Sequence, residues 1–276
     1  REDLAAAYRA MGDYEKAEET YLRTIELNRE PYSAHVNLGY TYYVQSKYEE
    51  AIEPFKRAIE LKPGDAAAYN YLGAVYSELE MWPDATRMFE RSRAIDSTSS
   101  RVISNLGTLY FKQGRFADAE RLYRRALDLS REEYKIWAHL AEAQYWNPEG
   151  RHKAPENFRR AAEIAEAELK TDSLNTVILS DLASYYEKLG EDARARLLLD
   201  KAVTLDTQDI DVIMHIDETY EKLGERDTAL EWIARALESG ALPSRIDRYP
   251  GLRKLRADPS YYNHPEGHRR KSPNGY

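Results

Sequence analysis

The stretch that decides the fold reads NLGYTYYVQSKYEEAIEPFKRAIELKP, from Asn37 to Pro63. Apolar residues recur in it three or four positions apart, which is the spacing of one face of an α-helix. In other copies of the same pattern a glycine breaks the run, and such a break is typical of a turn. Each copy therefore predicts two helices of about a dozen residues joined by a tight turn.

The pattern returns along the chain with a period of 34 residues, and one interval of 42 residues interrupts that period. Fixed periods of this length are the signature of repeat architectures. A small residue follows the aligned leucine in most copies, and a tyrosine lies four positions after it. The sequence therefore holds seven copies of the pattern. Their aligned residues are Leu4, Leu38, Leu72, Leu106, Leu140, Leu182 and Ile216.

Small and large residues have different tasks in each copy. The small residue next to the aligned leucine lets the two helices approach closely, and the large residues fill the space between one hairpin and the next. A single hairpin cannot bury its apolar face alone, so the copies must stack. The breaks that predict turns lie at Gly12, Gly114, Gly190 and Gly224.

The interval from Leu140 to Leu182 holds eight residues more than the period. We expect one extra residue near Trp146-Asn147-Pro148-Glu149-Gly150. We expect the other seven to lengthen the second helix through Glu163 to Lys170.

The pattern Asn-Leu-Gly-x-x-Tyr, followed by Tyr-x-x-Ala-x-x-x-Phe-x-x-Ala-Ile-x-Leu-x-Pro, resembles the tetratricopeptide repeat. The resemblance covers about residues 1 to 240. It implies an all-α fold, a right-handed superhelix of seven helix-turn-helix repeats, with the first helices lining a concave groove. Residues 151–259 are also similar to tetratricopeptide regions at the C-terminal ends of bacterial serine/threonine kinases, adenylate cyclases and transcriptional regulators.

The expected organisation is a repeat array, a capping segment and a mobile basic tail. Because the array starts inside a helix at Arg1, we expect a fragment or a processed product. The expected array spans residues 1–243, the capping segment 244–262 and the tail 263–276. The expected repeats are 1–31, 32–65, 66–99, 100–133, 134–175 with the insertion, 176–209 and 210–243.

Composition narrows the possible functions. The chain has no cysteine, which excludes disulfides, thiolate metal sites and a cysteine nucleophile. Its net charge of −8 argues against a sequence-independent grip on nucleic acid. No stretch approaches the roughly 20 apolar residues of a membrane span. We expect a cytoplasmic protein, or a periplasmic one if a membrane span precedes Arg1.

Signatures of catalysis are missing from the sequence. It has no glycine-rich phosphate loop, no His-Glu-x-x-His and no Gly-x-Ser-x-Gly. His139 and His215 share one register position with polar residues of other copies, which favours surface side chains over metal ligands. The prediction is a protein that is not an enzyme and uses no cofactor and no metal.

The resemblance implies a partner-binding groove formed by the first helices. Aromatic residues dominate its first two-thirds and acidic residues its end, which favours a peptide with apolar anchors and basic residues. An alternative is that the aromatic residues pack against neighbouring hairpins. The candidate residues are Asn37, Tyr40, Tyr43, Asn70, Arg101, Asn105, Phe111, Lys112, Glu142, Tyr145, Trp146, Glu187, Glu218 and Glu221.

Two known tetratricopeptide subclasses provide a comparison. The clamp for the C-terminal carboxylate of chaperone tails would need basic and amide residues where this chain has Val36, Tyr40 and Tyr71, so that ligand is disfavoured. The asparagine-lined groove of O-linked N-acetylglucosamine transferase is matched only at Asn37 and Asn105.

The predicted function is a scaffold that binds a partner protein or peptide. Two alternatives stay open, namely a regulatory arm of a bacterial signalling protein and an accessory domain that delivers substrate to a larger enzyme. Self-association through the apolar face of the first hairpin is a further expectation.

Overall fold

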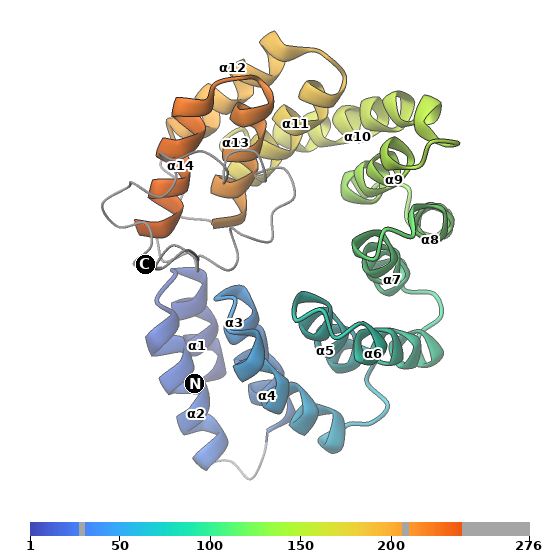
Figure 1. Cartoon of the computed structure of the whole chain (residues 1–276). Helices are drawn as coiled ribbons and strands as arrows, with labels where there is room; N and C mark the ends of the chain where they lie inside the picture. The colour runs from blue at the N-terminus through green and yellow to red at the C-terminus, as the bar shows by residue number, and fades with distance from the viewer. Residues whose placement is uncertain (28–30, 206–209, 239–276) are drawn as a thin grey trace, which may run out of the picture. The chain divides into compact units, whose positions relative to one another are not determined.

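The computed structural model describes residues 1–27, 31–205 and 210–238, and these residues form seven helical hairpins (Figure 1). Fourteen α-helices and one short 3-10 helix account for the regular structure of these ranges, with no strand among them. The chain is therefore an all-α solenoid, as the period predicts. The expected capping segment 244–262 and tail 263–276 lie outside the described residues.

Each hairpin consists of an odd-numbered first helix and an even-numbered second helix. The helices are α1 Glu2–Ala10, α2 Tyr14–Leu27, α3 Tyr32–Val44, α4 Tyr48–Leu61, α5 Ala66–Glu78, α6 Trp82–Ile95, α7 Ser100–Lys112, α8 Phe116–Leu129, α9 Tyr134–Trp146, α10 Ala154–Leu169, α11 Thr176–Lys188, α12 Asp192–Val203, α13 Ile210–Lys222 and α14 Arg226–Glu238. The 3-10 helix η1 is Arg151–Lys153.

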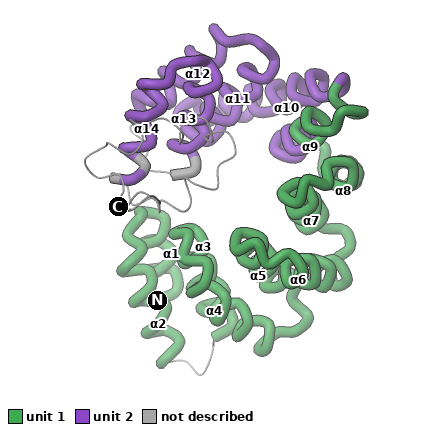
Figure 2. Tube along the Cα trace, in the orientation of Figure 1, with its two compact units in different colours: residues 1–131, 142–151 green, residues 132–141, 152–276 purple. Residues whose placement is uncertain are grey.

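Two compact units divide the chain (Figure 2). Unit 1 holds residues 1–131 and 142–151, and unit 2 holds residues 132–141 and 152–276, so the division passes through α9. Within unit 1, α1 contacts α3, α3 contacts α5 and α5 contacts α7. Within unit 2, α11 contacts α13. In each unit the first helices thus form one layer, and the second helices form another layer packed against it (Figure 1).

Local sequence sets where several first helices begin. Asp65 precedes α5, and its carboxylate accepts a hydrogen bond from the Ala67 amide at 2.8 Å. Asn175 does the same for α11 by accepting from the Ile178 amide at 3.1 Å. Both side chains satisfy an amide that the first helical turn leaves without a partner.

The tight turns inside the hairpins need a left-handed residue. Gly12 and Gly114 have φ of 78° and 72°, as the predicted breaks require. The second and third repeats place Ser46 and Glu80 at the same position, with φ of 60° and 57°. The turn geometry therefore holds in these two repeats without glycine, at a steric cost that glycine avoids.

Glycine has a second role where the two helices of a hairpin cross. A Cβ atom built on Gly73 would lie 2.9 Å from the ring of Phe89, and one on Gly107 would lie 2.9 Å from the ring of Tyr123. Both rings are buried. The small residue beside the aligned leucine therefore makes room for the aromatic ring of the facing helix, as expected from the sequence.

The insertion is distributed differently from the sequence-based expectation, which was wrong. Seven residues separate α9 from α10, whereas three separate α3 from α4. The second helix α10 has 16 residues against 14 in α4, and six residues link it to α11 against four between α4 and α5. Half of the extra residues thus lengthen the turn after α9, because Pro155 places the start of α10 later in the chain.

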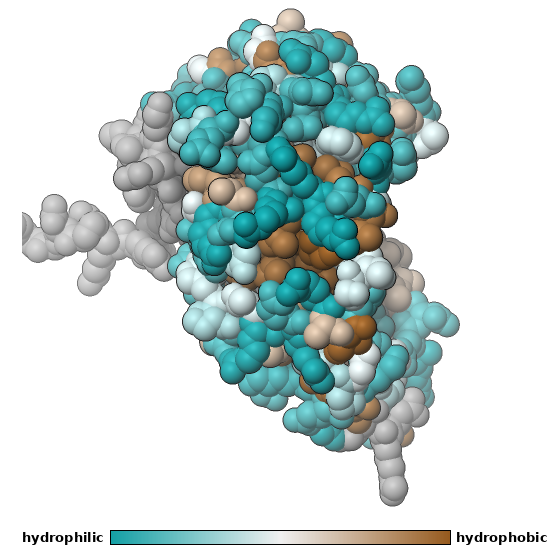
Figure 3. Space-filling model, turned by 90° about the vertical axis from the view of Figure 1, so that its right-hand side faces the viewer, coloured by the Kyte–Doolittle hydropathy of each residue, from teal (hydrophilic) through white to brown (hydrophobic). Residues whose placement is uncertain are grey.

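Figure 3 shows the side on which α6 and α8 lie, and hydrophilic side chains cover most of it, with hydrophobic side chains visible in a band near its middle. Of the helices in the described ranges, none has the length and apolar character that crossing a membrane requires.

Candidate partner-binding surface

The candidate groove residues of unit 1 lie on α3, α5, α7 and the second half of α9. They fall into two groups of aromatic side chains with polar residues between them along the chain. Most of the aromatic side chains lie where a first helix ends and the second helix begins, which is the turn edge of the hairpins. Tyr40 and Tyr71 lie further inside α3 and α5.

The first aromatic cluster consists of Tyr40, Tyr43, Tyr48 and Tyr71. The Tyr40 ring lies 6.4 Å from the Tyr43 ring and 5.6 Å from the Tyr71 ring. The edge of Tyr48 meets Tyr43 at 5.6 Å, and the Arg9 guanidinium lies 5.0 Å from the centre of the Tyr40 ring. The four rings support one another and remain partly exposed. The cluster is therefore an ordered aromatic surface.

The second aromatic cluster consists of Phe111, Phe116, Tyr145 and Trp146. Phe111 and Phe116 meet edge to face at 5.3 Å, which repeats the Tyr43–Tyr48 geometry two hairpins further on. Trp146 stacks on Phe116 at 6.3 Å, and Tyr145 meets Trp146 at 5.6 Å. Tyr145 and Trp146 are 40% and 49% exposed. Packing against the preceding hairpin therefore occurs, but it leaves about half of the indole open.

The aromatic residues of the turn edge are not required by the repeat itself. The fifth position after the aligned leucine is Tyr43, Phe111 or Tyr145 in three repeats of the array. The other four repeats have polar or charged residues there, namely Arg9, Ser77, Glu187 and Glu221. Since these repeats fold equally into hairpins, the repeat geometry does not require an aromatic side chain at this position.

The asparagine side chains of this face already have partners within the chain. Asn70 is buried, and its side-chain oxygen accepts a hydrogen bond from Asn105 at 3.0 Å. The side-chain oxygen of Asn37 accepts from Arg9 at 3.3 Å. Contacts between neighbouring hairpins therefore use part of the hydrogen-bonding capacity that could otherwise bind a peptide backbone.

The charged candidate residues of unit 1 differ in their partners and in their exposure. Lys112 pairs with Glu78 at 2.7 Å, across one repeat. Arg101 is exposed in the first turn of α7, and Glu142 is half-buried on α9. The polar region between the aromatic clusters thus carries both signs of charge.

The acidic candidates of unit 2 have cationic partners. Lys222 lies 2.8 Å from Glu218 and 3.9 Å from Glu187, and Arg226 lies 2.5 Å from Glu221. Burial raises the pKa of Glu218, but the charges of Lys222, Lys188 and His215 outweigh burial and hold that pKa below its ordinary value. The side chain of Asp211, another acidic residue of α13, lies outside the part of the chain whose side chains are described.

A buried polar network in unit 2 went unrecognised in the sequence. Tyr134 donates a hydrogen bond to Asp181 at 3.0 Å, and His215 Nδ1 lies 3.3 Å from the other carboxylate oxygen. Burial raises the pKa of Asp181, but His215, Lys135 and Tyr134 lower it by more than burial raises it. The pKa therefore lies below its ordinary value, and the carboxylate stays charged. The shared register position of Asp181 and His215 was the available signal, because aligned positions on successive first helices lie side by side.

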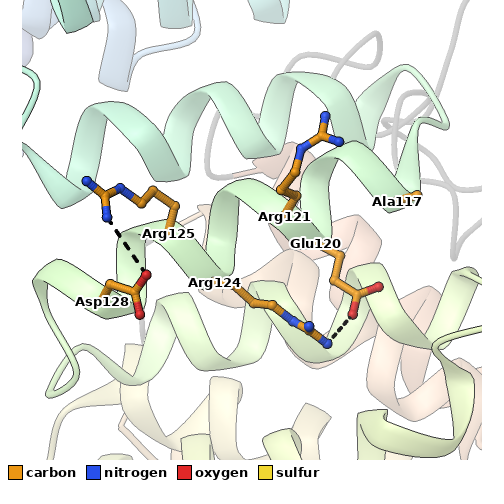
Figure 4. Close-up of a pocket in the computed structure, with 6 residues that line it drawn as sticks. All are labelled: Ala117, Glu120, Arg121, Arg124, Arg125 and Asp128. Atoms are coloured by element: carbon orange, nitrogen blue, oxygen red, sulfur yellow. Dashed lines mark hydrogen bonds and ion pairs between the residues drawn. The ribbon is translucent and has the colours of Figure 1, made fainter.

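Two further features concern metal-ligating side chains and surface depressions. In the part of the chain that the structure describes, no group of three His, Cys, Asp or Glu side chains could hold a metal ion. An open depression on α8 is lined by six residues (Figure 4). Its arginines are paired, Arg124 with Glu120 at 2.6 Å and Arg125 with Asp128 at 3.9 Å, so it presents an ion-paired helix face.

Fold and surface together define a helical repeat protein, a solenoid of stacked hairpins. Two family models, both described as tetratricopeptide repeat, match residues 2–76 and 101–135. The chain is an array of tetratricopeptide repeats.

Solved structures share this fold. A tetratricopeptide repeat protein from Parabacteroides merdae ATCC 43184 is 17% identical with a TM-score of 0.57, and the match covers 93% of this chain and 97% of that one. A crystal structure of MamA is 22% identical with a TM-score of 0.52, over 60% of this chain and 96% of that one. No curated protein matches the chain.

Proposed function

We propose that the chain is a non-catalytic scaffold that binds a partner protein or peptide along the turn edge of unit 1. The observation that supports this most directly is the pair of partly exposed aromatic clusters, in which Tyr43, Phe111 and Tyr145 occupy a position that the other four repeats fill with polar or charged residues. Aromatic side chains in ordered, partly open surroundings dominate the energy of protein interfaces.

The partner would contact Tyr43 in the first cluster and Phe111 in the second. Between them it would pass Asn105, which is only partly buried and whose orientation is fixed by its hydrogen bond to the buried Asn70. Because Glu187, Glu218 and Glu221 are paired with cations, the case for basic residues in the partner is weaker than the sequence indicated.

Site-specific photo-crosslinking in cells of the source organism tests the proposal. A photoreactive phenylalanine analogue replaces Tyr43 or Phe111, and Leu197, which is exposed on α12, serves as the matched control. We expect one protein to be crosslinked from both aromatic positions and not from the control.

The purified partner should then bind the wild-type chain and lose at least tenfold in affinity to the double variant Tyr43→Ala/Phe111→Ala. Circular dichroism must show that the double variant keeps its helices. Crosslinks that form equally from all three positions, or an unchanged affinity of the folded double variant, would refute binding at the turn edge.

A further inference from the structure

Trp146 occupies a position where four of the other six repeats carry a charged residue. It is the sixth residue after the aligned leucine, and the aligned residues in four other repeats are Glu78, Lys112, Lys188 and Lys222. A half-exposed tryptophan in the place of an ionised residue leaves apolar surface in water. Its neighbour Tyr145 is exposed as well, so two adjacent rings are open to a ligand.

The turn after α9 holds these two rings in place. Glu120 on α8 accepts hydrogen bonds from Gln144 at 3.1 Å and from Asn147 at 3.2 Å, so it ties the last turn of α9 to the preceding hairpin. Gly150 is buried directly against the Glu120 carboxylate, where a Cβ atom would lie 3.1 Å from its oxygen. The longer turn is therefore fixed to α8 rather than looped out.

Arg151 completes the arrangement. Its Nε donates a hydrogen bond to the Tyr145 carbonyl at 2.8 Å, and its guanidinium lies 5.5 Å from the centre of the Tyr145 ring. Arg151 is exposed, and within residues 1–27, 31–205 and 210–238 no carboxylate pairs with it. An anchored guanidinium with open terminal nitrogens thus borders the aromatic pair.

We propose that Trp146, Tyr145 and Arg151 form an anchoring subsite for a partner segment with an apolar side chain followed closely by a carboxylate. The inference rests on the proposed function and assigns the chemistry of one end of that surface. The apolar side chain covers the open indole, and the carboxylate pairs with Arg151, whose planar nitrogens suit it. A cationic side chain is disfavoured, because Arg151 already lies over the Tyr145 ring.

NMR with blocked dipeptides tests the subsite directly. The probes are N-acetyl-Leu-Asp-amide and its neutral and basic counterparts with Asn or Lys, each added at millimolar concentration to the labelled chain. We expect the indole N–H signal of Trp146, assigned with Trp146→Phe, to shift most with the acidic probe. The preference over the neutral probe should be roughly threefold in dissociation constant, as for an exposed ion pair.

Variants distinguish the contribution of the Arg151 charge to binding from that of the aromatic surface. Arg151→Gln should abolish the preference for the acidic probe and Arg151→Lys should restore part of it, whereas Arg159→Gln, at an exposed arginine on α10, should change nothing. An unshifted Trp146 signal with all probes overturns the subsite. Equal shifts with the acidic and basic probes overturn the role of Arg151.

Glu120 acts as a positioning residue in this arrangement. Glu120→Ala should speed amide hydrogen exchange in residues 144–151 and weaken the acidic probe several-fold, while Glu132→Ala, at an exposed site before α9, should do neither. The dipeptide assay does not depend on Tyr43 or Phe111. If the dipeptide binds but no partner is crosslinked from Tyr43 and Phe111, the proposed turn-edge surface is refuted and the subsite stands. If a partner is crosslinked but the dipeptide does not bind, the subsite is refuted and the turn-edge surface stands.

Discussion

Single residues at the crossing of the two helices decide how closely a hairpin packs. Gly39 and Gly73 face phenylalanine rings, and a Cβ atom on either would lie within 3.0 Å of the ring. Where the sixth repeat has Ala183 instead, the facing residue is the smaller Leu199. The sixth repeat thus combines a larger residue at the crossing with a smaller facing side chain, in keeping with the close packing of protein interiors.

Gly73→Ala should destabilise the chain by about 2 kcal/mol, because the added methyl group overlaps the Phe89 ring and the packed core cannot yield freely. Urea unfolding followed by circular dichroism measures the change. The double variant Gly73→Ala/Phe89→Leu, which copies the sixth repeat, should regain part of the loss. Gly64→Ala, with nothing within 4 Å of the new methyl group, is the control. Equal losses at both glycines would contradict the argument.

Asp217 is the exception at this crossing position. It is 0% exposed, and neither carboxylate oxygen has a hydrogen-bond partner in the described part of the chain. Burial, and then the charges of Glu218 and Glu221, raise its pKa from 3.8 to about 9. The carboxyl is therefore protonated in the folded chain at neutral pH and ionised in the unfolded chain.

Asp217→Ala should stabilise the chain by about 2 kcal/mol near pH 8, since it removes a buried polar group without a partner. A raised carboxyl pKa makes the wild type lose stability as pH rises from about 4 to about 9, because only the unfolded state releases the proton in that range. The gain of the variant should therefore be small at pH 4 and grow towards pH 9. Urea unfolding across this range, with the exposed Glu231→Ala as control, measures it. A gain that does not depend on pH would contradict the assignment.

At the scale of elements, neighbouring first helices are joined by polar contacts between aligned positions. Lys112 reaches back to Glu78 in unit 1, and Lys222 reaches back to Glu187 in unit 2. These pairs lie one period apart or nearly so, because stacked repeats bring equal positions side by side. The ion pairs of unit 2 replace the aromatic contacts that join α7, α8 and α9 in unit 1.

Lys222→Met should raise the pKa of Glu218 above its ordinary 4.5, because burial then acts with less opposition. In the wild type the lowered pKa contributes stability above pH 4.5 that is lost on acidification. We expect the variant to be less stable by about 1 kcal/mol at pH 7, within the range of partly exposed ion pairs. Carbon NMR titration of the Glu218 carboxyl measures the pKa, and Lys201→Met, at an exposed site on α12, is the control. An unchanged pKa would exclude Lys222 as the main partner.

At the scale of the molecule, stability is local because each hairpin packs mainly on its neighbours. The core of unit 1 runs through residues such as Phe55, Leu72, Phe89 and Leu106, each from a different helix. In such arrays stability is close to a sum over repeats and their interfaces. A destabilising substitution in a hairpin with neighbours on both sides should therefore change the unfolding of the chain in a different way from one in the first hairpin.

Phe89→Ala, at a buried site on α6, should cost about 4 kcal/mol and let the hairpins on either side unfold at different urea concentrations. Tyr21→Ala in the first hairpin removes a ring of similar size, but it should only loosen α1 and α2. Hydrogen exchange with mass spectrometry, read hairpin by hairpin, distinguishes these outcomes. One concerted transition for the Phe89 variant would show that unit 1 is too cooperative for the additive description.

The sequence by itself determined the fold class, because a 34-residue period with alternating small and large positions is satisfied only by stacked hairpins. It also indicated which first-helix residues to consider as a binding surface. The groove as a whole remains a prediction, with its residues divided between the two units.

Only the tertiary structure decided which candidate side chains are open and which are already paired. Asn70, Glu218 and Glu221 are engaged within the chain, whereas Tyr145 and Trp146 keep much of their surface. It also showed that half of the extra residues lengthen the turn that carries Arg151. Asn70 and Asn105 lie about one repeat apart, so their contact depends on how the hairpins stack. Glu218 and Glu221 pair with Lys222 and Arg226 a few residues further on, where the side-chain conformations decide the contact. Periodicity alone gives neither.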